Sequence, residues 1–148
     1  MRRIPLVLAV AVLLSACSQS ATEPSVVGFT VTLALNSSSV ASGQPLGWTL
    51  TVANAGNVAG RLDFSSGCQA NFLVRNGGGE VWNDKWVTAC TGALTYVDLG
   101  PGESKQYRGS WRQQTSTGAA LPGSYAAEGE LLTSPPVSSS AVTFAIRR

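Results

Sequence analysis

The amino-acid sequence predicts an all-β fold, an antiparallel β-sandwich of about eight or nine strands. From residue 26 onward, apolar and polar side chains alternate with the period of two that is typical of a strand buried on one face. Turn signals rich in Gly, Pro, Asn and Ser recur about every 8 to 12 residues. No stretch has the apolar spacing of an amphipathic helix.

The first two strands are expected at residues 26–35 and 46–53, where the alternation is unbroken. Their apolar faces are expected to carry Val27, Phe29, Val31, Leu33 and Leu35 in the first strand, and Leu46, Trp48, Leu50 and Val52 in the second. Residues 36–43, which are rich in Ser, and residues 54–57, which contain Asn and Gly, indicate the turns that end them.

A hairpin between residues 62 and 86 is expected at the centre of the fold. Residues 61–64 and 71–75 each alternate as half-buried strands, separated by a Ser-Ser-Gly-Cys corner. The Asn-Gly-Gly-Gly run at residues 76–79 tolerates positive φ. Residues 80–82 should therefore return antiparallel along the preceding strand.

The remaining strands are expected at residues 93–99, 104–113, 125–131 and 142–146, separated by Gly- and Pro-containing turns. A closed barrel is the rival architecture. The Pro-Pro and Ser-rich residues 134–140 suit an edge or a crossing between sheets, and therefore favour the sandwich.

The four Trp residues fall into two pairs. Trp48 and Trp111 lie in register with apolar neighbours and are expected in the core. Trp82 and Trp86 flank a point where a strand gives way to a loop. Aromatic residues there often simply cover an end of the sandwich; the alternative is that one of the two is partly exposed as a contact residue.

The N-terminus resembles the signal of bacterial lipoproteins. A basic leader precedes eleven apolar residues at positions 4–14, fewer than the about 20 that span a bilayer. Residues 14–17, Leu-Ser-Ala-Cys, resemble the lipobox, whose Cys thiol is diacylglyceryl-modified and becomes the new amino terminus. The alternative is an ordinary secretory signal with Cys17 left unmodified, or oxidised with another cysteine.

This resemblance divides the chain into a signal peptide (1–16), a lipidated tether (17–25) and one domain (26–148). Cys17 would anchor the protein to the cell membrane or the outer membrane, facing the periplasm or the exterior. Without the leader, eight Lys and Arg balance eight Asp and Glu. We therefore expect no nucleic-acid partner and no electrostatic attachment to anionic lipid.

Lipidation of Cys17 would leave Cys68 and Cys90 as a pair. Exported proteins meet oxidising conditions, so a disulfide between them is expected. It would close a loop of about 23 residues, which the chain-entropy estimate values at roughly 3 to 3.5 kcal/mol. The spacing is not that of a CxxC redox centre, and two cysteines without histidine make a poor zinc site.

The chain contains no histidine, which removes the commonest general base and the usual nucleophile pairs. Glu128 and Glu130 share one strand face and could act as paired acids, but a solvated outer face is the simpler interpretation. We predict no enzymatic activity, no cofactor, no metal and no small-molecule substrate.

The order of motifs resembles the intracellular proteinase inhibitor family of BsuPI type, an immunoglobulin-like β-sandwich. The resemblance covers about residues 48–132. The residues that carry it are LTVAN at 50–54, LDFSSG at 62–67, FLVRN at 72–76 with GEVW at 79–82, LGPGES at 99–104, the aromatic strand at 107–111 and PGSY at 122–125.

The resemblance implies a protein partner, with a serine protease as the candidate. If the domain presents a loop to a protease, the best physical candidate is residues 83–91, because Cys90 ties one end and limits the entropy lost on binding. Lys85 and Trp86 are its candidate contact residues. The alternative function is a structural or adhesive immunoglobulin-like envelope module that inhibits nothing.

Overall fold

The computed structural model describes residues 25–26 and 28–148, and the described part is all-β apart from one short 3-10 turn. Nine of its strands have five residues or more, so the predicted sandwich of about eight or nine strands is confirmed. The predicted signal peptide (1–16), the lipidation site Cys17 and nearly all of the tether lie outside the described residues. The described residues include no helix of the length and apolarity that crossing a membrane requires.

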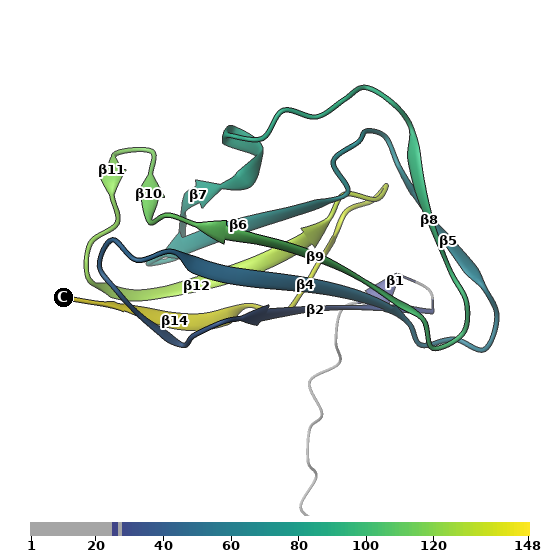
Figure 1. The fold of residues 1–148 in the computed structure, drawn as a ribbon, viewed down its shortest axis with the longest axis horizontal. Helices are drawn as coiled ribbons and strands as arrows, with labels where there is room; N and C mark the ends of the chain where they lie inside the picture. The colour runs from purple at the N-terminus through teal and green to yellow at the C-terminus, as the bar shows by residue number, and fades with distance from the viewer. Residues whose placement is uncertain (1–24, 27) are drawn as a thin grey trace, which may run out of the picture.

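The strands form two main sheets, which Figure 1 shows as two layers. The first sheet has the order β1-β2-β4-β9, made of β1 (Ser25–Val26), β2 (Phe29–Leu35), β4 (Leu46–Asn54) and β9 (Ser104–Trp111). The second has the order β3-β14-β12-β6-β7, with β13 beside β12; its strands are β3 (Ser39–Ala41), β6 (Ala70–Asn76), β7 (Gly79–Asn83), β12 (Gly123–Leu131), β13 (Val137–Ser138) and β14 (Val142–Arg147). All neighbours are antiparallel except β3 and β14, which are parallel.

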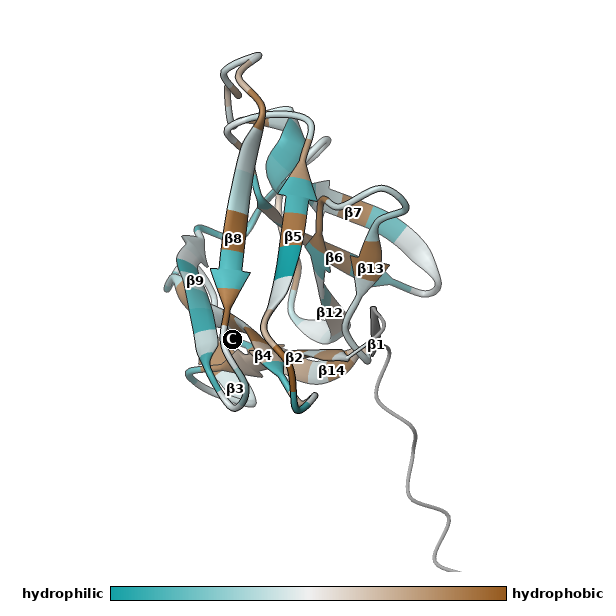
Figure 2. Ribbon diagram, turned by 90° about the vertical axis from the view of Figure 1, so that its right-hand side faces the viewer, coloured by the Kyte–Doolittle hydropathy of each residue, from teal (hydrophilic) through white to brown (hydrophobic). Residues whose placement is uncertain are grey.

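A separate two-stranded ribbon, β5 (Gly60–Phe64) with β8 (Thr95–Leu99), extends the sandwich at one end. Figure 2 shows hydrophobic and hydrophilic positions alternating along both strands. On the exposed face, Arg61 donates to Asp98 at 2.7 Å and lies 4.1 Å from the centre of the Tyr96 ring. The hydrogen bond from Arg61 holds the pKa of the Asp98 carboxyl below its ordinary value. A second small hairpin joins β10 (Gln114–Thr115) and β11 (Gly118–Ala119).

Six aromatic rings from both sheets form the centre of the core. Successive ring centres lie 5.1 to 6.2 Å apart, in stacked, tilted and edge-to-face pairs of the kind that add to simple burial. The rings belong to Trp48, Phe72, Trp82, Trp111, Tyr125 and Phe144. Trp48 and Trp111 are buried, as predicted.

Strand β6 differs from its prediction as a half-buried strand. Asn71 and Leu73 are buried as well as Phe72 and Val74, so both faces of β6 are covered. The reason is tertiary, because the short 3-10 turn η1 (Asp84–Trp86) packs beside the outer face. The other feature of the predicted hairpin is confirmed: β7 returns antiparallel along β6 after the Gly-rich turn.

The prediction of one continuous strand over residues 26–35 was wrong. Gly28 adopts a φ of +85°, a conformation favoured by glycine, and the chain reverses there. As a result β1 pairs back onto the start of β2, with Val26 opposite Phe29. From Phe29 onward the predicted apolar face is present, with Phe29 and Val31 buried.

Candidate functional site

A disulfide joins Cys68 and Cys90, with an S–S distance of 2.04 Å. Cys68 lies in the corner between β5 and β6, and Cys90 lies in the segment that follows η1. The bond therefore fixes a long connection between β7 and β8 to the body of the sandwich. We call residues 84–94 of this connection the tethered loop.

Hydrogen bonds give the tethered loop a defined shape at both ends. At its start, the backbone N–H of Lys85 donates to the side chain of Asn83, and the Thr88 hydroxyl donates to Asp84 at 3.0 Å. Near its end, the N–H of Gly67 donates to the carbonyl of Thr91 at 3.0 Å. The loop is thus held by a covalent bond and by hydrogen bonds on either side of its exposed middle.

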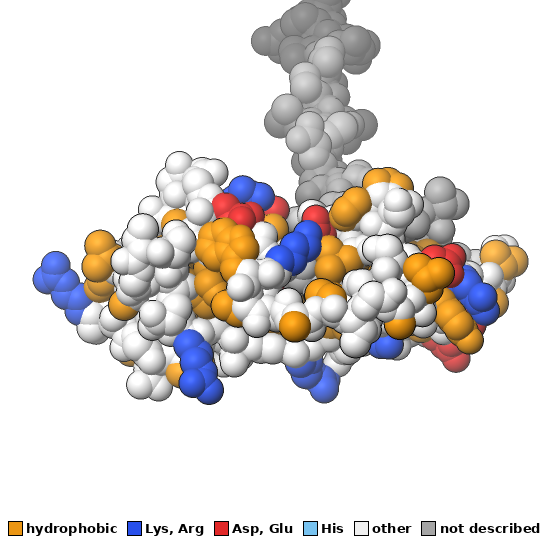
Figure 3. Space-filling model, turned by 90° about the horizontal axis from the view of Figure 1, so that it is seen from above, with side chains coloured by type: hydrophobic (Ala, Val, Ile, Leu, Met, Phe, Trp, Pro, Cys, Tyr) orange, Lys and Arg blue, Asp and Glu red, His pale blue; other side chains and the backbone are white. Residues whose placement is uncertain are grey.

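The tethered loop carries large apolar side chains into solvent. Trp86 is 51% exposed, Val87 71% and Leu94 83%. Figure 1 shows the loop running from η1 to β8 along one side of the sandwich. Figure 3 looks down on that side and shows hydrophobic side chains reaching the surface among mostly uncharged ones. Exposed aromatic and aliphatic groups on a constrained loop are typical of a protein-binding surface.

The two predicted contact residues, Lys85 and Trp86, lie in different surroundings. Trp86 projects into solvent, whereas the ammonium of Lys85 lies 2.8 Å from Glu130 on the face of the sheet. Glu130 also accepts from Asn71, and Glu128 pairs with Arg75 at 3.1 Å. Each of the two acids thus has a cation partner, which is the arrangement of a charged outer face.

Two shallow hollows lie between the tethered loop and strand β9, of about 310 and 240 Å³. They share Asp84 and Ser110 and so form one groove, which we call the β9 groove. Trp48 lines the first hollow and Trp82 the second. Sequence reasoning missed this groove, because it forms only where β9 and η1, distant in the chain, approach each other.

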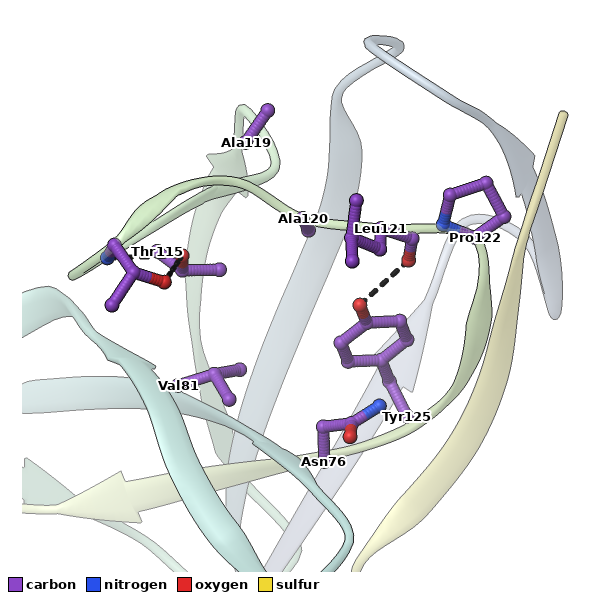
Figure 4. A pocket seen from close by; sticks show the side chains of 9 residues that line it. Asn76, Val81, Thr115, Ala119, Ala120, Leu121, Pro122 and Tyr125 are labelled. Carbon is purple, nitrogen blue, oxygen red and sulfur yellow. Dashed lines mark hydrogen bonds between the residues drawn. The ribbon is translucent and has the colours of Figure 1, made fainter.

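A third hollow, of about 320 Å³, lies beside the small β10–β11 hairpin. Figure 4 shows the Tyr125 ring in it, with the hydroxyl directed at the Leu121 carbonyl, to which it donates at 2.6 Å. The described residues that line this hollow include no acidic, basic or cysteine side chain. Within residues 25–26 and 28–148, no group of three acidic, Cys or His side chains is placed to hold a metal ion.

Tyr107 of β9 stands at one end of the groove, and its hydroxyl donates to Gln69 at 3.0 Å. Burial raises the pKa of this hydroxyl to about 12. Above pH 10 the unfolded chain loses its tyrosine proton before the folded protein does, so the free energy of unfolding should fall between pH 10 and about 12. Urea denaturation of Tyr107→Phe across this range should show a shallower fall; an identical pH profile would contradict the assignment.

Comparisons with known proteins found one family match and distant similarity to solved structures. The family model described as BsuPI, intracellular proteinase inhibitor, matches residues 33–136. A β-glucosidase from Erythrobacter marinus is similar in structure, with a TM-score of 0.50 and 13% identity over 84% of this chain and 16% of the enzyme. A CARDB domain from Pyrococcus furiosus, solved with di-metal ions, has a TM-score of 0.46 and 16% identity over 84% of this chain and 90% of that domain.

The likeness to the β-glucosidase concerns the fold alone, and this chain spans only a small part of that enzyme. A search of curated proteins found no match. The family match covers most of the chain, including β4, the central hairpin, the tethered loop and β9. The chain therefore belongs to the BsuPI family of intracellular proteinase inhibitors.

Proposed function

We propose that the protein is a non-enzymatic, lipid-anchored inhibitor that binds a serine protease of the cell envelope through the tethered loop. The observation that carries this proposal is an exposed apolar segment, Trp86 and Val87, fixed by the Cys68–Cys90 disulfide. A loop that is already ordered loses little conformational entropy on binding. Membership of a proteinase inhibitor family supports a protease as the partner.

The sequence features of residues 1–17 support attachment to a membrane. The eight residues 18–25 reach about 27 Å when extended, which would keep the domain near the membrane surface. We expect the anchor to be Cys17, with the domain facing the periplasm or the exterior.

Lipidation can be tested directly in cells. Replacing Cys17 with Ser should abolish incorporation of labelled palmitate and move the protein from the membrane fraction to the soluble fraction, because a single thiol carries the lipid. Replacing Cys68 with Ser serves as the control, since that cysteine belongs to the domain. Continued labelling of Cys17→Ser would contradict the anchor.

Inhibition can be tested with the purified domain, residues 18–148, against subtilisin-like and chymotrypsin-like proteases. We expect stoichiometric, saturable inhibition of at least one of them. Trp86→Ala should raise the inhibition constant by about 30-fold or more, the usual cost of losing an aromatic hot spot. Val58→Ala is the matched control, because Val58 is also an exposed apolar residue, 70% exposed, and lies outside the loop.

The effect of Lys85 should be smaller. Its ammonium already pairs with Glu130, and exposed ion pairs contribute only about 0 to 1 kcal/mol. Indifference of the whole protease panel would instead favour a structural or adhesive envelope domain.

A further inference from the structure

Strand β9 is an open edge of its sheet. It pairs with β4 on one side and with no strand on the other among the described residues. Its exposed residues include Gln106, Arg108, Gly109 and Ser110. An edge strand presents a row of unpaired backbone N–H and C=O groups, which another extended chain can pair with.

The β9 groove lies beside this edge, and Gly109 keeps its floor open. A Cβ at residue 109 would lie only 2.6 Å from the indole ring of Trp48. Trp48 in turn stacks on Phe72, with ring centres 5.1 Å apart, so it has little freedom to move away. The missing side chain therefore leaves the indole of Trp48 bordering the groove.

The indole N–H groups of Trp48 and Trp82 form no hydrogen bond within the described part of the chain, and both remain accessible to solvent. Trp48 is 8% exposed and Trp82 is 7% exposed, and each lines one hollow of the groove. Trp111, by contrast, donates its indole N–H to the Gln114 carbonyl at 2.7 Å. An indole N–H is a donor only, so an entering peptide carbonyl would accept from either indole in place of water.

The charges along the β9 edge indicate which kind of strand it would bind. Lys105, Arg108 and Arg112 follow one another along β9 and just beyond it, whereas Asp84 is the sole acidic side chain among the described residues that line the groove. A second copy of β9 would place two sets of these basic residues along one shared edge, which is destabilising. An acidic strand would instead be attracted.

From these observations we propose that the β9 groove binds an extended, acidic polypeptide segment of a partner protein, which adds to β9 as a further strand. Its carboxylates would lie against Arg108 and Arg112, and its backbone carbonyls would accept from Trp48 and Trp82. Asp84, Val87 and Thr88 of the tethered loop line this groove but Trp86 does not, and the proposal does not require the loop to inhibit a protease.

A synthetic probe tests the proposal on the domain of residues 18–148. The probe is a fluorescein-labelled octapeptide of alternating Val and Thr with two Asp substitutions, and binding is measured by fluorescence anisotropy. We expect saturable binding that weakens about tenfold or more when Lys replaces Asp, or when the amides along one edge are N-methylated. Arg108→Glu should reverse the preference for Asp over Lys; Arg147→Glu, exposed on β14, is the matched control and should leave it unchanged.

Two readouts locate the bound peptide without altering the core. On titration, the NMR signals of the Trp48 and Trp82 indole N–H groups should move while that of Trp111 stays, and hydrogen exchange should slow in residues 104–111. Trp86→Ala should bind the peptide as the native domain does, even where it no longer inhibits a protease. Binding that survives N-methylation, indole signals that do not move, absence of binding, or dimerisation through β9 would overturn the proposal.

Discussion

Replacing both Cys68 and Cys90 with Ser should lower the free energy of unfolding by about 3 kcal/mol. The two residues are separated by 22 positions, and a crosslink over a loop of this size removes that amount of chain entropy from the unfolded state. The melting temperature should fall by about 10 °C for a domain of this length. Thermal and urea denaturation of the native and doubly substituted domains measure both quantities.

The same double substitution should also weaken inhibition, and it should have a smaller effect on functions that do not involve Trp86. Without the disulfide, the tethered loop keeps the hydrogen bonds at Asp84 and Thr91 but loses its covalent hold. Ordering it at a protease would then cost more, so the inhibition constant should rise by about tenfold or more. Reducing the native domain is the matched control and should give the same changes. Unchanged stability with unchanged inhibition would show that the loop does not depend on the bond.

The alternation of side chains predicted the strands whose one face is buried and whose other face is more open. In β4, Leu46, Leu50 and Val52 are buried between partly exposed neighbours. The same logic failed in β6, because η1 and the Lys85–Glu130 ion pair cover its outer face. Nothing local to Asn71 indicates that a distant segment will bury it.

The shortest strands were missed for a related reason. Strand β3 has three residues, and its pairing is with β14, about a hundred residues further along the chain. A segment this short carries too few alternating positions to be recognised. Its Ser-rich sequence correctly indicated a turn region, but the strand within it is decided by the neighbour that it meets.

In the candidate site, too, the sequence predicted features that depend on neighbouring residues but not those that depend on residues far apart in the chain. The Cys68–Cys90 pairing could be expected from counting cysteines and from the resemblance of the N-terminus to an export signal. The place of Trp82 and Trp86 at a strand end allowed one of them to be exposed, without indicating that it would be Trp86. The β9 groove could not, because Trp48, Asp84 and Ser110 come together only in the folded sandwich. Gly109 was the one signal in the sequence, since a glycine replaces an apolar residue in the alternation of β9.

Trp111→Ala should destabilise the fold more than any other single truncation of a tryptophan. Trp111 is 1% exposed, and its ring lies about 6 Å from those of Trp82, Tyr125 and Phe144. Its indole N–H also donates to Gln114. Removing a fully buried aromatic side chain leaves a cavity and costs about 3 to 5 kcal/mol. That is a large share of the about 5 to 15 kcal/mol that stabilises a typical domain.

Urea denaturation of three variants separates this role from the role of the loop. Trp111→Phe should cost less than Trp111→Ala, because it keeps an aromatic ring among its neighbours and loses mainly volume and one hydrogen bond. Trp86→Ala should change the free energy of unfolding by less than about 0.5 kcal/mol, as surface substitutions usually do. If Trp111→Ala and Trp86→Ala lowered the free energy of unfolding equally, the assignment of Trp111 to the core and of Trp86 to the binding surface would be wrong. With the expected values, a weaker inhibition by Trp86→Ala reports on binding and not on folding.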